Sequence, residues 1–515
     1  MDVVAGAPRG SLPLTASTDL SPRRIFAFWA PLAATWLMMA IEGPYLAAVV
    51  ARLPEPTLGL AAYGVAIALA VLVEAPVIML LSASTALVED AVSYRRLRTF
   101  AHGLNAFSTL MLLAVLVPSV HRGLMLGVLG LPEDLANLTY GALWCFLPWP
   151  AAIGYRRFWQ GVLIRSGRTR LVAGGTIVRL VSMSVAALAL ALATDLPGAA
   201  VGASALSFGV VMEAAVARWM ARDAIGALLV PTGRPAEAAE AADPADPVTV
   251  SADPHDIAEI GRVGVSTADP ESGAGTEGGE LRFGEIGRFY VPLMLTSLIG
   301  IAIQPMLTFF MGRAASPVES LAVFPVVHSL GFIFRSVGLS FQDAVIALLG
   351  RKDEGYEAIR RFALGLGATL SGILALLAFT PLSHLWFVHV SGLTPELASF
   401  AIPAARVLTP VPFLGVLLSL QRGTLIRHRT TGPIIIGTAA EISAVAIVFV
   451  AVGWGLGWVG ATAAFTGFLV GRLMANIYLT PKVRAAKRKA AGTGTDGKSG
   501  TPRESTDSRH RGSSG

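Results

Sequence analysis

The sequence contains two copies of one pattern, and this repeat limits how the chain can fold more than any other feature. Residues 23–222 match residues 285–480 at an offset of 258 to 262 positions. The matching stretches are Pro31–Arg52 with Pro292–Arg313, Tyr94–Ala101 with Tyr356–Ala363, and Gln160–Thr169 with Arg422–Thr431. Because a repeated unit packs against its copy, the repeat predicts two similar bundles with a binding site between them.

Long apolar runs fill both copies of the repeat. The chain is 54% hydrophobic and 14% charged, whereas soluble domains carry about 25% charged residues. Apolar runs of about 20 residues are long enough to cross the core of a bilayer. We therefore expect an all-α integral membrane protein with twelve transmembrane helices, arranged as two pseudo-symmetric six-helix lobes. The expected spans are 26–50, 60–88, 100–119, 138–158, 171–194, 199–221, 287–312, 320–349, 362–383, 397–420, 433–454 and 457–480.

Basic residues alternate from loop to loop along the chain. Arginine clusters occupy the loops at 95–98, 165–170, 351–361 and 427–429, whereas the intervening loops carry single arginines such as Arg52. Loops rich in lysine and arginine stay in the cytoplasm. The alternation therefore predicts a multi-pass protein of the cytoplasmic (inner or plasma) membrane with both termini in the cytoplasm.

Three segments differ in composition from the lobes. Residues 226–280 contain eleven acidic residues and two arginines, a composition that buries too little apolar surface to fold. We expect a disordered N-terminal segment (1–22), a first lobe (23–222), a disordered acidic cytoplasmic tether (223–284), a second lobe (285–481) and a disordered basic tail (482–515). The surplus positive charge lies in loops and the tail, where a lipid bilayer explains it, so nucleic acid is excluded as a partner.

Ionisable residues inside the apolar spans mark candidate sites, because a charge in a membrane is costly and faces partners or water. Several occupy matching positions in the two copies with opposite sign. The matched positions are Glu74 with Arg335, Arg179 with Glu441 and, one residue out of register, Glu213 with Arg472. Two interpretations stay open, namely a cavity with walls of opposite charge or neutralised ion pairs that hold spans together.

Glu42 is the favoured ion-coupling residue. It precedes Gly43-Pro44, where the missing proline amide is expected to break the helix and free carbonyl groups to bind an ion beside the carboxylate. Gln304-Pro305 holds the corresponding place in the second copy. Glu74, which precedes Pro76, fits either a coupling or a structural role.

The substrate-binding candidates are five further polar residues within the expected spans: Arg179, His328, Arg335, Arg406 and Glu441. Histidine is the side chain whose ordinary pKa is close to neutral, so His328 could take part in transport, or it could be a hydrogen-bonded packing residue. The sequence has no HExxH, GxSxG, P-loop or cysteine–histidine cluster, so we expect neither catalytic residues nor a bound metal. We expect no cofactor, and Na⁺ or H⁺ would enter only as a transported ion.

The repeat resembles the multidrug and toxic compound extrusion (MATE) family, part of a group of multidrug, oligosaccharidyl-lipid and polysaccharide exporters. Local detail is most similar to the progressive ankylosis branch, and Glu42 matches a first-span glutamate of that branch. The resemblance is carried by Ala61–Leu69, Gly161–Arg165, Ile303–Arg313, Phe324–Gly331, Arg406–Pro412 and Gly460–Phe468.

The resemblance implies a V-shaped pair of lobes that rock between inward-open and outward-open states. It implies export of small organic molecules in exchange for H⁺ or Na⁺, with Glu42 as the coupling carboxylate. Members of the family more often have an aspartate there, and the second copy has Ile303-Gln304-Pro305 where some members have an acid.

The sequence leaves three further functions open. The ankylosis branch implies export of anions such as pyrophosphate, nucleotides or citrate. The candidate contacts for such anions are Arg179, Arg335, Arg406 and Arg472. The wider group also includes flippases of lipid-linked sugars. A scaffold that does not transport would instead pair its intramembrane charges fully and leave no cavity. The sequence assigns no oligomeric state.

Overall fold

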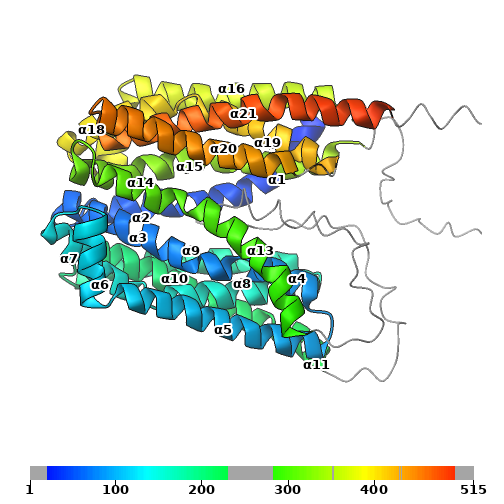
Figure 1. Cartoon of the computed structure of the whole chain (residues 1–515), viewed down its shortest axis with the longest axis horizontal. Helices are drawn as coiled ribbons and strands as arrows, with labels where there is room; N and C mark the ends of the chain where they lie inside the picture. Colours follow the sequence, from blue (N-terminus) through cyan, green and yellow to red (C-terminus); the bar gives the residue numbers. More distant parts are fainter. Residues whose placement is uncertain (1–19, 230–281, 351–352, 429, 431, 493–515) are drawn as a thin grey trace, which may run out of the picture.

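The computed structural model describes residues 20–229, 282–350, 353–428, 430 and 432–492. Most of the expected N-terminal segment, tether and tail falls outside these residues. The described residues form two helical lobes that lie one above the other in Figure 1, with the first lobe in blue to green below.

Helices occupy all six expected spans of the first lobe. Each expected span coincides with one helix or with a pair of consecutive helices separated by a short break. The helices are α1 (Pro22–Ala40), α2 (Glu42–Val50), α3 (Pro56–Ile78), α4 (Leu80–Leu87), α5 (Ala91–Val115), α6 (Pro118–Arg122), α7 (Glu133–Cys145), α8 (Trp149–Arg165), α9 (Thr169–Ala193), α10 (Gly198–Met220) and α11 (Arg222–Leu229).

The second lobe repeats this order. The helices are α13 (Phe283–Ile301), α14 (Ile303–Met311), α15 (Pro317–Leu348), α16 (Tyr356–Phe379), α17 (Leu382–His384), α18 (Pro395–Leu408), α19 (Val411–Arg427), α20 (Gly432–Phe449) and α21 (Gly460–Gly492). Among the described residues, eight helices are long and apolar enough to cross a membrane, or nine if the pair bent by 70° at Val115–Pro118 is one span. The twelve-span, two-lobe prediction agrees with this architecture.

Two helical stretches run past the expected domain boundaries. The helix α11 lies where the tether was expected to begin, and α21 continues to Gly492, beyond the boundary placed at residue 481. The extension of α21 is rich in alanine, lysine and arginine, which are strong helix formers. The basic residues after position 481, which led us to expect a tail, are therefore compatible with a helix as far as Gly492.

The first span of each lobe is broken at the predicted proline. Helix α1 ends at Ala40 and α13 at Ile301, each four residues before its proline, Pro44 or Pro305. A proline ring clashes with the carbonyl group four residues earlier, so the break falls where the chemistry requires. Pro76 has a weaker effect, because α3 continues past it to Ile78.

The two half-spans α1 and α13, which we call the crossing arms, pack against the opposite lobe. Helix α1 packs mainly along α15 of the second lobe, and α13 packs mainly along α3 of the first. The Trp29 indole donates a hydrogen bond to the Ser340 hydroxyl (2.8 Å), and the Tyr290 hydroxyl donates to the Pro76 carbonyl. Trp29 and Tyr290 hold matching positions in the repeat, so an aromatic donor at the same place anchors each arm to the opposite lobe.

The bundle has two distinct ends. The end at the right of Figure 1, which we call the proximal end, contains the described chain ends at α1, α11, α13 and α21. The opposite, distal end contains two short π-helices, η1 (Gly123–Val128) and η2 (Leu385–Val390), which hold matching positions in the repeat. A third π-helix, η3 (Val450–Gly455), follows α20.

Candidate functional site

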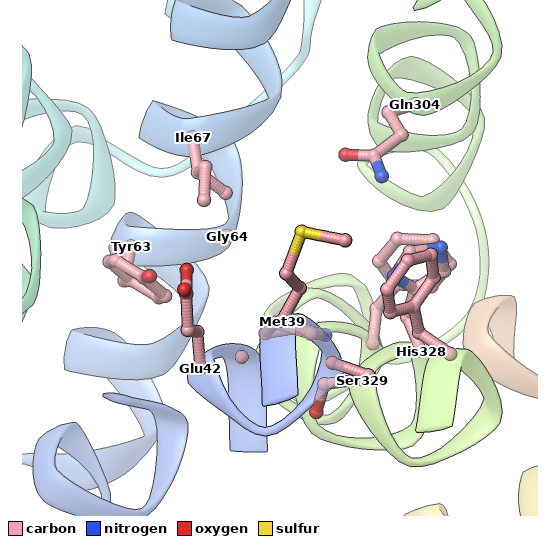
Figure 2. Close-up of a pocket in the computed structure, with 13 residues that line it drawn as sticks. Met39, Glu42, Tyr63, Gly64, Ile67, Gln304, His328 and Ser329 are labelled. Atoms are coloured by element: carbon pink, nitrogen blue, oxygen red, sulfur yellow. The ribbon is translucent and has the colours of Figure 1, made fainter. Parts of the chain in front are cut away.

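A cavity lies between the lobes at the break in the first span. Its empty space, including the part that opens to solvent, is about 660 Å³. Figure 2 shows Glu42 and Tyr63 on one side of it and Gln304 and His328 on the other, with Met39 between them. The lining residues are Met39, Ala40, Glu42, Gly43, Tyr63, Gly64, Ile67, Gln304, Phe324, Pro325, His328, Ser329 and Phe332.

Glu42 connects this cavity to a buried cluster of charges in the first lobe. Its carboxylate accepts a hydrogen bond from the Arg179 guanidinium of α9 at 2.7 Å. Arg179 also lies 3.5 Å from Glu213 of α10, which in turn pairs with Arg156 of α8 at 3.1 Å and accepts a hydrogen bond from Gln160. We call Glu42, Arg179, Glu213 and Arg156 the first-lobe cluster. Its ion pairs join the broken span to α8, α9 and α10.

A second cluster of charges occupies the same place in the second lobe. The Glu441 carboxylate of α20 lies 3.0 Å from Arg472 of α21 and 3.8 Å from Arg422 of α19. Arg422 also donates a hydrogen bond to the Thr438 hydroxyl at 3.0 Å. We call Arg422, Glu441 and Arg472 the second-lobe cluster. Compared with the first lobe, the cation and the anion have exchanged places between the fifth and sixth spans.

A second cavity, of about 370 Å³, adjoins the first within the second lobe. The two cavities share His328 and Phe332 as lining residues. Arg335 and Arg472 both line the second cavity, and the Arg335 guanidinium lies 5.1 Å from the centre of the Phe332 ring. The combined space therefore meets a carboxylate on the side of the first lobe and guanidinium groups on the side of the second.

Aromatic rings form much of the wall of the second lobe. The His328 ring stacks on Phe324 with 5.5 Å between centroids, and Phe324 stacks on Phe465 at 5.4 Å. Phe468 lies 6.0 Å from Phe465. Such rings offer a flat apolar face to a bound organic molecule.

The structure brings only part of the predicted site together. Glu42, Gln304 and His328 line the first cavity, and Arg335 lines the second. Pro44 and Pro305 act through the helix breaks and are not among the lining residues. Arg179 and Glu441 belong to the two clusters and reach the cavities through Glu42 and Arg472.

Glu74 and Arg406 are not among the residues that line these two cavities. Glu74 is fully buried and accepts a hydrogen bond from the Trp149 indole. Arg406 donates to the Ala378 carbonyl at 3.2 Å and lies over the Phe379 ring. For both residues the geometry favours a structural role over a place in the cavity.

Sequence reasoning missed several members of the site. Arg156, Gln160 and Arg422 hold the carboxylates of the two clusters, and none was among the predicted site residues. A signal was available, because Gln160 and Arg422 open the matched stretches Gln160–Thr169 and Arg422–Thr431. Tyr63 carried no such signal, because its place beside Glu42 depends on how α3 packs.

No family model matches the sequence, and no curated protein does. Solved structures of transporters match it along most of its length. An inward-facing multidrug resistance MATE family transporter of the MOP superfamily matches with a TM-score of 0.59 and 14% identity, over 90% of this chain and 99% of that chain. The lipid II flippase MurJ, in an inward closed conformation, matches with a TM-score of 0.63 and 11% identity, over 90% of each chain.

A third solved structure also matches along most of the chain. A MOP superfamily transporter from Pyrococcus furiosus, described as having reverse polarity of its binding pocket, matches with a TM-score of 0.53 and 14% identity, over 92% of this chain and 97% of that chain. Together with its long apolar helices, these likenesses define the chain as a multi-pass membrane protein. Its fold is the one that MATE transporters and the MurJ flippase share.

Proposed function

We propose that this protein is a secondary active exporter that moves small organic molecules out of the cytoplasm by alternating access, in exchange for H⁺ or Na⁺. The observation that carries the proposal is the position of Glu42. It is a buried carboxylate, 1% exposed, that lines the cavity between the lobes at the break of a crossing arm. Like other ligand sites, this cavity is lined by apolar and aromatic side chains with a few polar groups.

The first-lobe cluster supplies a route for coupling. Arg179 lies between two carboxylates, 2.7 Å from Glu42 and 3.5 Å from Glu213. A proton or Na⁺ that binds Glu42 neutralises it and weakens its attraction to Arg179, and Glu213 then attracts the guanidinium more strongly than Glu42 does. Ion binding at the cavity would thus change the forces between the broken span and α9.

The proposed orientation places the proximal end in the cytoplasm. Arginine-rich segments lie at this end, namely the first turns of α5 (Arg95, Arg96 and Arg98) and the residues around the turn between α8 and α9 (Arg165, Arg168 and Arg170), as do the corresponding segments of the second lobe. Loops on the cytoplasmic side of a membrane protein carry an excess of lysine and arginine. Both termini would then be cytoplasmic, and the distal end would face the outside of the cell.

Transport in proteoliposomes tests the proposal directly. The Glu42→Gln variant, with imposed pH and Na⁺ gradients and a panel of cationic dyes, pyrophosphate, ATP and citrate, should lose gradient-driven efflux. The amide keeps the shape of the side chain but has no charge to exchange with an ion. Efflux that keeps its normal dependence on the gradient in this variant would refute Glu42 as the coupling residue.

Glu74→Gln is the matched control, because Glu74 is a buried carboxylate of the same lobe that does not line either cavity. This variant should keep the gradient dependence of the wild type. If both variants lose transport equally, the effect comes from removing any buried carboxylate and the cavity position is irrelevant.

Anion export is a second candidate function. Arg335 and Arg472 line the second cavity, where guanidinium groups can bind carboxylate or phosphate. Arg335→Ala should then reduce efflux of pyrophosphate or citrate more than efflux of a cationic dye. An equal reduction for both kinds of substrate would argue against a specific anion contact.

The structure and the proteoliposome assay also test the scaffold and flippase hypotheses. A scaffold that pairs all its charges was expected to leave no cavity, so the two cavities count against that hypothesis. A flippase of lipid-linked sugars would move a labelled lipid-linked substrate between leaflets and leave the small solutes in place. The solute panel therefore distinguishes an exporter of small molecules from a flippase.

A further inference from the structure

Two arginines connect the lobes at the distal end. At the end of α2 in the first lobe, Arg52 donates from Nη2 to the His389 and Val390 carbonyl groups of η2, at 2.7 and 2.9 Å. At the end of α14 in the second lobe, Arg313 donates from Nη2 to the Gly127 carbonyl group of η1 at 2.9 Å. Each arginine therefore reaches from one lobe to a π-helix of the other.

The two contacts are copies of one another. Arg52 and Arg313 are matched in the repeat, and so are the acceptors His389 and Gly127. A guanidinium bound to carbonyl groups at the end of a helix is favoured by the dipole of that end as well as by the hydrogen bonds.

A glycine in a left-handed conformation follows each π-helix and lies beside the arginine, and at Gly392 the approach is too close for a Cβ atom. Gly392 follows η2 with φ +76°, and a Cβ atom built there would lie 2.8 Å from Nη1 of Arg52. Gly130 follows η1 with φ +69°, and a Cβ atom there would lie 3.6 Å from Cζ of Arg313. Both glycines adopt a left-handed conformation that other residues rarely take, so each turn brings the backbone close to a guanidinium.

We propose that Arg52 and Arg313 form the outer gate of the transport cycle, a pair of symmetric latches that must release together before the cavity opens at the distal end. The inference rests on the proposed alternating access. The distal contacts lie across the lobe boundary, so moving the lobes apart there breaks all three hydrogen bonds. Both arginines are exposed, so water can replace the carbonyl groups once they separate.

Labelling of a cavity cysteine tests the gate without any substrate. Cys145 is the only cysteine of the chain, so Cys145→Ser gives a background into which Ser329→Cys, on the cavity wall, is introduced. A thiol reagent that cannot cross membranes is added from the distal side. For the double variant Arg52→Ala with Arg313→Ala we expect labelling about tenfold faster or more, since hydrogen bonds to charged groups are lost.

The matched control is Arg122→Ala. Arg122 is also exposed, and it pairs with Glu133 of its own lobe at 2.9 Å. Its removal should leave the labelling rate unchanged. Equal rates for the double latch variant and for Arg122→Ala would overturn the proposal.

A second reporter separates gate opening from unfolding. Ala203→Cys places a thiol in α10 at a position with no exposed surface. If the latch variants label both reporters, they have unfolded. In that case the milder variants Arg52→Lys and Gly392→Ala, which weaken the latch without removing it, are tested instead. If they label the cavity reporter faster and leave the Ala203→Cys reporter unlabelled, the gate is supported. If their labelling is unchanged, the proposal is overturned. Because labelling needs no transported solute, a negative transport result leaves this test intact.

Discussion

The two buried clusters have the same position in their lobes and opposite arrangements of charge. In the first lobe the fifth span carries Arg179 and the sixth Glu213, whereas in the second lobe these places hold Glu441 and Arg472. The attraction within an ion pair does not depend on which side carries which sign. Holding the spans together therefore does not explain the reversal.

The difference between the clusters lies in what they present to the cavities. The first-lobe cluster presents the carboxylate of Glu42, which α2 adds beside Arg179. The second-lobe cluster presents the guanidinium of Arg472 itself, and the corresponding place on α14 holds Ile303, an apolar residue. We infer that the reversal sets the polarity of the two walls. Three predictions test how the two lobes differ, two at the clusters and one at the start of the third spans.

Removing the central cation should have the largest effect. In Arg179→Ala, Glu42 loses its ion pair with the Arg179 guanidinium, whereas Glu213 keeps its contacts with Arg156 and Gln160. Breaking a buried ion pair costs about 3 to 5 kcal/mol, so the thermal midpoint in detergent should fall sharply. Arg472→Ala should cost less, because Arg422 still faces Glu441. Equal losses in the two variants would show that the clusters are not built differently.

Exchanging the charges of the second lobe should change selectivity more than stability. The double variant Glu441→Arg with Arg472→Glu keeps an ion pair but puts a carboxylate on the wall of the second cavity. A like charge in place of a guanidinium should lower anion efflux by about tenfold or more, while dye efflux is kept or raised. The comparison fails if the double variant transports anions as the wild type does.

The smallest effect is expected where the two lobes begin their third spans. The Asp90 carboxylate caps α5 by accepting from the Ser93 amide and hydroxyl at 2.7 Å, whereas the matching α16 begins after Gly355, which has φ +82°. Asp90→Ala should lower stability by about 1 kcal/mol.

The pH dependence of this loss identifies the charge. Hydrogen bonds from Ser93 lower the pKa of Asp90 below 3.8, so the stabilising contribution is present above the unfolded pKa and disappears as pH falls through the folded pKa. The difference in thermal midpoint between wild type and Asp90→Ala should therefore shrink below about pH 4. Asp90→Asn keeps the acceptor and should show a smaller loss with little dependence on pH.

Much of the fold follows from local chemistry that the sequence displays. Pro44 and Pro305 predicted the two breaks, since a proline ring clashes with the carbonyl group four residues earlier. The repeat and the apolar runs indicated two lobes of six spans. The reversed signs at Arg179 and Glu441 could be read from the sequence, because they depend only on the alignment of the two copies.

Long-range packing could not be predicted in the same way. The sequence predicted Glu74 and Glu42 as site residues for the same reason, since each is acidic and close to a proline. Of these two residues, only Glu42 lines one of the described cavities. The contact of Glu74 with Trp149 depends on how α3 meets α8. The exchange of the crossing arms, fixed by contacts such as Trp29 to Ser340, likewise depends on residues far apart in the chain.

The crossing arms also bear on how the protein is made. The first lobe is synthesised before α13. Tyr290 of α13 contacts the Pro76 carbonyl of α3 and the Phe100 ring, so these contacts form only after the second half of the chain has been made. In turn, α1 meets its partner α15 only after the whole first half has been synthesised. Neither half therefore has its full set of packing helices until part of the other half is present.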